Sequence, residues 1–260
     1  MKIRAGLLIF ALIALLSGLA LADFAPFSFP KDETVVFENS SPDKELTWVT
    51  NTYYASGKNF VIKVSEHDGS VTKITLDKNF IPLNYKKTSK AGATLEYSEY
   101  GKGKLHIKVP AKNIDKTVKL PDKYYDPYTL YYVFRKFPFG KKDSETIYLA
   151  YHDPGNIRVV KMQVKYKGKE TVKTKSGKFE CYRLELGTVN PLDVAVWPYK
   201  YNFWFTTDAN RHFVKFTGRE KDASIIASEI MTYKVGNKYI VKRSSSGSVT
   251  RSDLIGSNSF

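Results

Sequence analysis

The chain has 260 residues, with 41 Lys and Arg against 26 Asp and Glu, and a single cysteine. One cysteine cannot form an internal disulfide, which excludes the class of small exported proteins whose folds depend on disulfide bonds. A chain of this length can bury a hydrophobic core of its own, and its positive charge points to anionic partners.

The N-terminus has the pattern of a secretory signal peptide. A basic stretch, Met1–Arg4, precedes an apolar run, Ala5–Leu19, and then Ala20-Leu21-Ala22. We predict a signal peptide over residues 1–22, cleaved after Ala22. A retained anchor is the alternative, but the run is shorter than the roughly 20 residues of a membrane span. The processed chain is therefore expected to be exported, to the periplasm or alternatively the extracellular space, and not to be an integral membrane protein.

Export also limits the anionic molecules that this positively charged protein is expected to bind. Nucleic acid is not expected outside the cytoplasm, which leaves anionic lipid, acidic polysaccharide or an acidic protein. The simpler interpretation is that lysines fill the outward positions of strands, where they also block edge-to-edge aggregation.

The first half of the chain predicts a β-meander. An aromatic lead-in, Asp23–Lys31, is expected to pack its phenylalanines onto the domain. Short alternating segments joined by turn residues such as Asp68-Gly69 then favour consecutive antiparallel strands. These strands are expected at Thr34–Glu38, Glu45–Ala55, Asn59–Glu66, Ser70–Leu76, Leu83–Thr88, Thr94–Tyr100, Lys104–Val109 and Ile114–Leu120.

The pattern changes to that of a capped helix between Asp122 and Pro138. Asp126 can cap its N-terminus, Pro127 fits the first helical position, and Pro138 ends it. Leu130, Tyr131, Phe134 and Phe137 recur at helical spacing and give one broad apolar face. We expect this helix to fill the concave side of the sheet.

Strands resume after the helix, and two hairpins dominate this half. In the first, Val172 faces Phe179, Cys181 and Leu184 across the turn at Gly177, and in the second Trp204-Phe205 and Phe213 flank Asp208–Arg211. The expected strands are Glu145–Tyr151, Asn156–Tyr166, Glu170–Lys175, Lys178–Leu186, Lys200–Thr206, His212–Arg219, Ala223–Tyr233 and Val235–Lys242.

These elements predict a mainly β protein. Residues 23–242 would form a single β-rich domain, and the Ser/Gly-rich residues 243–260 a disordered tail. Because no helical segments separate the strands, the sheet should be antiparallel. The expected fold is a large curved antiparallel sheet, an open or incomplete barrel, with one short aromatic helix packed on its concave side.

Catalytic and metal-binding patterns are missing from the sequence. The four histidines are scattered, and no nucleophile elbow or phosphate loop is present. Glu96 and Glu99 fall on opposite faces of a strand, as do Glu180 and Glu185, which does not suit paired carboxylates. Cys181 lies in the apolar register of its strand and reads as a packing thiol. We therefore expect no enzyme activity, no metal site and no cofactor.

Several short motifs resemble those of an exported family catalogued as domain of unknown function 3108. They are Asp126-Pro127-Tyr128 before Leu130-Tyr131-Tyr132, Glu170-Thr171-Val172, Ser176-Gly177-Lys178-Phe179 with Arg183, and Trp204-Phe205 with Asp208. The resemblance runs from Phe29 to Tyr233, although Phe213 stands where the family pattern has proline. It implies a large curved antiparallel sheet with a helix against it, similar in outline to periplasmic lipoprotein carriers, and it implies no catalytic residues.

The leading hypothesis is an exported, non-enzymatic envelope protein that binds a lipid-like or amphipathic anionic ligand in the curved sheet. Tyr131, Phe134 and Trp204 would line the cavity, and Arg135 or Arg183 would meet the head group. A protein-interaction or scaffold module of the envelope, with an envelope protein as partner, is the first alternative. A hydrolase is the second.

Overall fold

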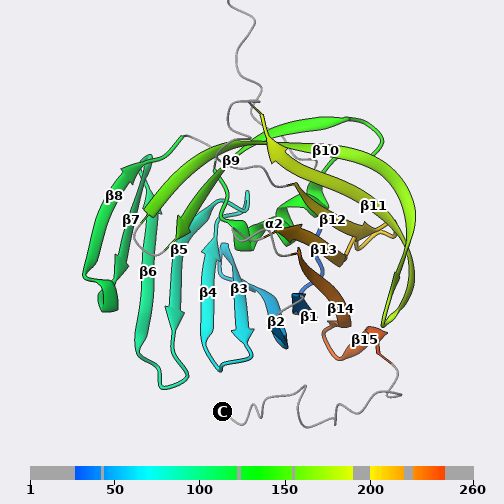
Figure 1. Ribbon diagram of the computed structural model, residues 1–260, viewed down its shortest axis with the longest axis horizontal. Coiled ribbons are helices and arrows are strands. Elements are labelled where there is room, and N and C mark those ends of the chain that lie inside the picture. Colours follow the sequence, from blue (N-terminus) through cyan, green and yellow to red (C-terminus); the bar gives the residue numbers. More distant parts are fainter. Residues whose placement is uncertain are drawn as a thin grey trace, which may run out of the picture.

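A computed structural model describes residues 27–41, 44–121, 124–153, 156–189, 200–219 and 225–243. Within these residues fifteen strands form one curved sheet, and every strand pair in it is antiparallel (Figure 1). This agrees with the mainly β fold class and with the open curved sheet predicted from the sequence.

The sheet consists of two meanders joined side by side. The first contains β1 (Glu33–Ser41), β2 (Lys44–Ser56), β3 (Asn59–Glu66), β4 (Val71–Leu76), β5 (Pro82–Thr88), β6 (Thr94–Gly101), β7 (Lys104–Val109) and β8 (Ile114–Lys119). The second contains β9 (Ser144–Asp153), β10 (Asn156–Thr174), β11 (Gly177–Thr188), β12 (Tyr201–Thr206), β13 (Phe213–Arg219) and β14 (Ile225–Val235), and β15 (Lys238–Lys242) pairs with β14.

The two meanders meet where β1 pairs with β14, so β8 and β9 become the two edges of the sheet. The segment between β8 and β9 crosses from one edge to the other, and its described residues, 120–121 and 124–143, include the helical segment. Tyr125 pairs with Leu149 of β9 in a single parallel bridge, and the Leu120 amide donates to the Gly103 carbonyl beside β7. This crossing segment therefore places the helix on the concave side.

The helical segment is continuous but mostly 3₁₀, with η2 (Pro127–Thr129), α2 (Leu130–Val133) and η3 (Phe134–Lys136) in succession. The Asp126 carboxylate accepts a 2.8 Å hydrogen bond from the Tyr128 amide, which confirms the predicted cap. Phe134 and Phe137 have no exposed surface and contribute to the one large hydrophobic core between helix and sheet.

The strand predictions hold to within a few residues, with one correction. Two strands were expected at Asn156–Tyr166 and Glu170–Lys175, but β10 runs through both. Its pairing with β11 shifts between Tyr166 and Lys169, where Gly168 has a φ of 100°. An irregularity of this kind bends a strand without ending it, and a glycine tolerates the positive φ.

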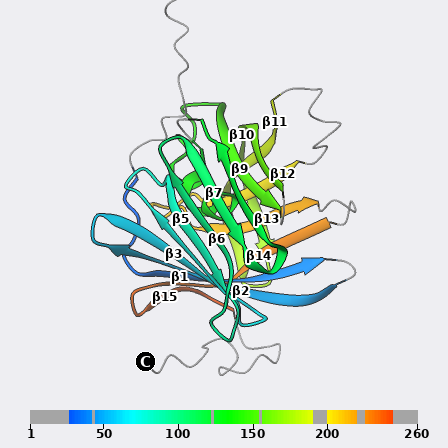
Figure 2. The same ribbon diagram turned by 90° about the vertical axis from the view of Figure 1, so that its left-hand side faces the viewer.

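The strands end alternately at two ends of the sheet. We define the closed end as the end of the sheet at which Glu33 and the turns of residues 77–81 and 207–212 lie. The open end is the opposite one, with the residue 67–70 and 89–93 turns. Figure 2 shows the outer face of the first meander, whose strands run between these ends.

Some predictions lie outside the described residues: the signal peptide over residues 1–22, and the tail from residue 244 onward. Within the part that the structure describes, none of the helices is long and apolar enough to span a bilayer.

Candidate functional site

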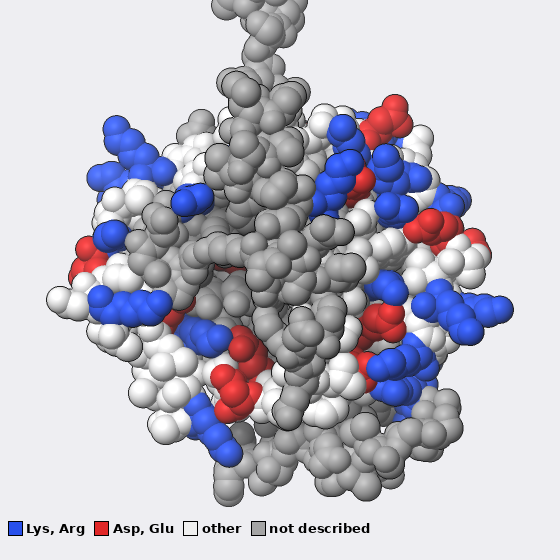
Figure 3. All heavy atoms as spheres, viewed as in Figure 1, with Lys and Arg blue, Asp and Glu red and all other residues white. Residues whose placement is uncertain are grey.

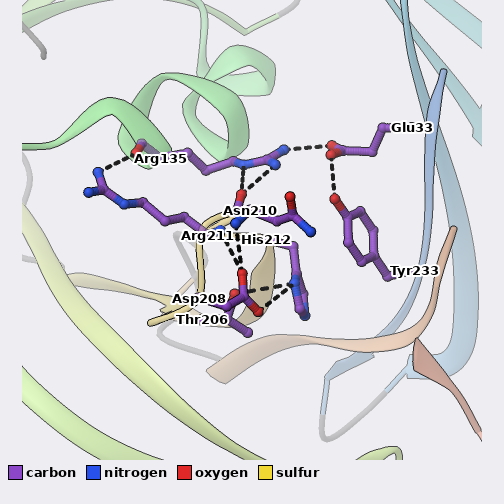
Figure 4. A network of polar contacts seen from close by, with 8 residues as sticks. All are labelled: Glu33, Arg135, Thr206, Asp208, Asn210, Arg211, His212 and Tyr233. Atoms are coloured by element: carbon purple, nitrogen blue, oxygen red, sulfur yellow. Dashed lines mark hydrogen bonds and ion pairs between the residues drawn. The ribbon is translucent and has the colours of Figure 1, made fainter. Parts of the chain in front are cut away.

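The closed end is organised around Arg135, which projects from η3 and is 1% exposed. One guanidinium nitrogen donates to Glu33 Oε1 at 2.6 Å, while Nε and the other nitrogen donate to the Asn210 carbonyl at 3.0 and 2.6 Å (Figure 4). Burial lowers the pKa of Arg135, but the charge and hydrogen bond of Glu33 outweigh this, and the net pKa is raised. Arg135 therefore stays charged, and each of its three side-chain nitrogens donates a hydrogen bond.

Further bonds tie this ion pair to three parts of the chain. The Tyr233 hydroxyl donates to the second oxygen of Glu33 at 2.8 Å. Arg211 donates from one nitrogen to the carbonyls of Arg135 and Phe137, both at 3.1 Å. These carbonyls lie at the C-terminus of the helical segment, where a cation is favoured. The residue 207–212 turn is thus locked onto the helix.

The aromatic lead-in covers this network. The rings of Phe27 and Phe29 lie 5.5 and 4.9 Å from the Arg135 guanidinium, and Phe29 also packs on Phe80 at 4.5 Å between ring centroids. Cation–π contacts of this kind are strongest where water is excluded. The predicted packing of the lead-in phenylalanines is confirmed for these two residues, and the closed end is sealed by them.

His212 sits beneath the network next to Thr206 and Asp208. Its Nδ1 is 3.2 Å from the Thr206 hydroxyl and 3.7 Å from the Asp208 carboxylate. Nε2 is buried and has no hydrogen-bond partner among the described residues. A catalytic histidine uses one nitrogen toward the nucleophile and the other toward the acid, so this arrangement is not a triad. Burial lowers the His212 pKa to about 4, against an opposing effect of Asp208.

The open end differs, because aromatic residues of the helix keep solvent-accessible surface inside the sheet. Tyr131 packs on Phe213 at 4.6 Å and on Phe37 at 6.0 Å, and Tyr128 packs on Tyr85 at 5.9 Å. Both helix tyrosines are nonetheless only partly buried. Acidic and basic side chains lie near the middle of the face seen in Figure 1 (Figure 3). We call the space inside the curved sheet beside the accessible side of these two rings the hollow.

Charged side chains of the sheet lie near the same rings. The Lys87 ammonium is 2.9 and 3.1 Å from the two Glu66 oxygens. Glu96 pairs directly with Lys87 in the β5–β6 register, so it extends from the same inner face. Burial raises the pKa of Tyr128, and the negative charges of Glu66, Asp126 and Glu96 raise it further. The open end therefore combines aromatic surface with a partly exposed Lys–Glu pair.

The residues predicted to bind a ligand are distributed over three places. Tyr131 is partly buried on the inner side of the sheet against Phe37, Phe203 and Phe213. Phe134 and Arg135 are fully buried, Arg135 in the network of the closed end. Arg183 and Trp204 are a cross-strand pair on the face opposite to Leu184 and Phe203, which belong to the core. Trp204 is buried and belongs to the core cluster as well, but the ring that contacts Tyr131 and Phe134 is that of Phe203, because the alternation of β12 turns Phe203 inward.

The Trp204 and Arg183 pair has its own partners on the outer face. Trp204 Nε1 donates to Glu170 at 2.5 Å, and the Arg183 guanidinium lies 5.5 Å from the indole ring. Arg183 also donates to the Asn202 side chain at 3.0 and 3.1 Å. The family-like motif that contains Glu170, Arg183 and Trp204 thus forms an outer cluster that ties β10, β11 and β12 together.

Sequence reasoning missed Glu33, Glu66 and Lys87. Glu33 was recognisable in principle, because it precedes Val35 and Phe37 at the two-residue spacing of an inward face. Glu66 and Lys87 are 21 residues apart and meet across β4, so only the strand register brings them together.

The described residues offer no metal centre, since no group of three or more His, Cys, Asp or Glu side chains among them could hold an ion. Cys181 is fully buried, and burial raises its thiol pKa to about 12, so the thiolate is disfavoured. This agrees with the packing role expected from its strand register.

Comparison with known proteins bears mainly on the fold. A family model described as "Protein of unknown function (DUF3108)" matches residues 29–225, and no curated protein matches the chain. A β-barrel-like protein of DUF1849 from Brucella abortus is 10% identical, with a TM-score of 0.57 over 81% of this chain and 100% of that chain. This similarity shows a shared fold and no more.

Two other solved structures superimpose less closely. The hypothetical lipoprotein YmcC from Escherichia coli K12 is 9% identical, with a TM-score of 0.37 over 88% of this chain and 97% of that chain. A LolA superfamily protein from Nitrosomonas europaea is also 9% identical, with a TM-score of 0.28 over 83% and 90%.

Proposed function

This chain belongs to the DUF3108 family of proteins of unknown function, and from that premise we propose that it is an exported, non-enzymatic envelope protein that holds an amphipathic anionic molecule in the hollow at its open end. One observation carries the proposal: Tyr128 and Tyr131 keep accessible surface inside the curve of the sheet. In a fully packed core, rings in that position would be covered on all sides.

The apolar part of the ligand would lie against aromatic and aliphatic side chains. Tyr131 contacts Phe37, Phe203 and Phe213, and Val49 faces inward directly opposite Phe37. A mostly apolar lining with a few polar groups is typical of sites for small amphipathic molecules.

The head group would lie near Lys87 rather than near the two arginines expected from the sequence. Arg135 is paired with Glu33 and Asn210, and Arg183 is on the outer face. Lys87 is about one quarter exposed and extends from the inner face of β5. An anionic head group would contact the Lys87 ammonium alongside Glu66, at a position that both water and ligand can reach.

The location in the envelope rests on the N-terminal sequence. The basic residues, apolar run and Ala20-Leu21-Ala22 have the order of a cleaved secretory signal. Amino-terminal sequencing of the protein isolated from its native host tests this, and the expected first residue is Asp23. An intact Met1 would refute the predicted processing.

The binding proposal is tested by filling the hollow from one strand. Val49→Trp adds a large side chain to the inner face of β2, whereas Thr50→Trp adds the same ring to its outer face. Each purified protein is extracted with organic solvent for mass spectrometry and titrated with the fluorescent apolar probe N-phenyl-1-naphthylamine. We expect the parent and Thr50→Trp to yield a lipid and to bind the probe, and Val49→Trp to lose both.

Three results would count against the binding site. They are the absence of any extractable lipid together with no probe binding, equal binding by both tryptophan variants, or loss in Thr50→Trp alone. A protein-interaction module is the alternative function, and cross-linking in intact cells should then trap an envelope protein with yields that Val49→Trp does not change.

A further inference from the structure

The outer face of the first meander carries a row of lysines that the hollow does not use. In the strand register Lys63 of β3 lies directly opposite Lys73 of β4, and Lys73 lies directly opposite Lys86 of β5. Neighbouring strands are about 4.8 Å apart, so the first and third lysines start roughly 10 Å from each other. Figure 2 views the sheet from this outer side.

The row continues across the sheet with Tyr97, Lys108 and Asp115, each opposite the next. Asp115 neutralises the far end, because it accepts from Lys108 at 3.2 Å and contacts His106 at 2.6 Å. Glu99 lies diagonally from Lys86 and instead accepts a hydrogen bond from Tyr97 at 2.5 Å. None of the ion pairs among the described residues involves Lys63, Lys73 or Lys86.

This arrangement is unfavourable for the sheet itself. Like charges directly opposite on neighbouring strands are destabilising, and a Lys–Glu–Lys order would be better. Protection of an exposed edge explains lysines on edge strands, but β3, β4 and β5 have a paired strand on both sides. The three aligned lysines therefore lack an anionic partner among the described residues, and an external anion would supply one.

We propose that this lysine row (Lys63, Lys73 and Lys86) binds a linear acidic polysaccharide laid across the strands. A chain of carboxylates can place successive charges over successive ammonium groups. The outer-face neighbours of the row include the hydrogen-bonding side chains of Thr52, Thr75 and Asn84, besides Val61 and Val71. Such hydrogen-bonding groups can bind sugar hydroxyls.

An anionic membrane surface fits the same face less well. Binding to a membrane is strengthened by apolar side chains that insert beside the basic ones. The exposed large hydrophobic residues of this meander, Leu46 and Leu95, lie on β2 and β6 with three strands between them. A curved outer face also brings only part of a row into contact with a flat surface.

The test uses the purified chain and polygalacturonate, with dextran as the neutral control. The triple variant Lys63→Gln, Lys73→Gln, Lys86→Gln is compared with Lys161→Gln, Lys165→Gln, Lys173→Gln. The second set removes three exposed lysines from β10 and gives the same net charge. We expect the first variant to bind polygalacturonate at least about tenfold more weakly and the second within about twofold of the parent, because screened surface charges act over roughly 10 Å.

A single substitution separates binding from folding. Lys73→Glu places a carboxylate between two lysines, so it should raise the thermal midpoint while weakening polygalacturonate binding at least as much as the triple change. A lysine row with only a structural role would not give that opposite pair of effects. Equal losses in both triple variants, no binding to polygalacturonate by the parent, or row-dependent binding to phosphatidylglycerol vesicles alone would each overturn the proposal.

Discussion

The closed and open ends of the sheet use similar residues in different ways. At the closed end, Arg135 is fully buried, and Glu33, Asn210 and the lead-in phenylalanines satisfy or cover it. At the open end, Lys87 and Glu66 are each about one quarter exposed beside tyrosines that also remain accessible. The same inner face thus stabilises the fold where its charges are enclosed and can bind a ligand where they are not.

The largest expected effect is the loss of the closed-end ion pair. Arg135→Ala leaves the Glu33 carboxylate buried next to the Tyr233 hydroxyl and removes both bonds to Asn210. Breaking a buried pair by removing one partner costs about 3–5 kcal/mol. Urea unfolding should show this decrease in the free energy of unfolding.

Arg183→Ala is the matched control, because it also removes an arginine that has a carboxylate partner, here Glu170 at 3.8 Å. That pair is partly exposed, and its loss should cost about 1 kcal/mol or less. Equal costs for the two arginines would mean that the closed end is not the more tightly coupled region.

The second effect is a pH dependence that belongs to the closed end. The folded state holds the His212 pKa at about 4, below its ordinary 6.5, so the unfolded chain binds a proton first as the pH falls. This contribution to stability is complete above pH 6.5 and is lost progressively down to about pH 4. The total loss is roughly 3 kcal/mol.

His212→Gln isolates this contribution. Between pH 6.5 and 4 its free energy of unfolding should fall less steeply than that of the parent in urea titrations. The lowered carboxyl pKa of Glu38, whose bonds to Lys175 and Arg243 outweigh its burial, gives both proteins a common loss that begins as the pH falls through 4.5. Parallel curves for the two proteins through this window would contradict the assignment to His212.

A third prediction compares two aromatic residues of the helix. Phe134→Leu removes ring atoms from a side chain with no exposed surface, and it should cost about 1–2 kcal/mol because a cavity is left. Tyr131→Leu should cost about 0.5 kcal/mol or less, since that ring already borders the hollow. The Phe134→Leu variant should bind N-phenyl-1-naphthylamine with the affinity of the parent, and the Tyr131→Leu variant should bind it with a changed affinity. The reverse order of stability losses would place the hollow beside Phe134.

Local chemistry made much of the fold predictable. Asp126, Pro127 and Pro138 bound the helical segment, and alternation with turn residues such as Asp68-Gly69 gave the strands. Both signals act over a few residues and survive in the folded chain. The pairing of β1 with β14 is different, because it depends on which strands close the sheet and has no local signal.

The candidate site was less predictable for the same reason. Arg135 meets Glu33 across 102 residues of sequence, and this partner changes its role from a head-group ligand to a structural cation. Trp204 was assigned to the cavity because it is aromatic, although the alternation of its own strand gives Phe203 the inward position. Composition identified the kinds of residues, while register decided which of them share a face.

The smallest expected effect lies at the open end. Lys87→Gln breaks a pair with Glu66 that solvent reaches, so it should cost about 1 kcal/mol or less in urea unfolding. If an anionic head group uses this ammonium, the variant should retain less extractable lipid than Lys86→Gln, which removes the neighbouring lysine from the opposite face. Equal lipid retention by the two variants would move the head group away from Lys87 while leaving the apolar hollow in place. A stability loss as large as that of Arg135→Ala would instead show that the open end is enclosed as fully as the closed end, which contradicts the contrast between them.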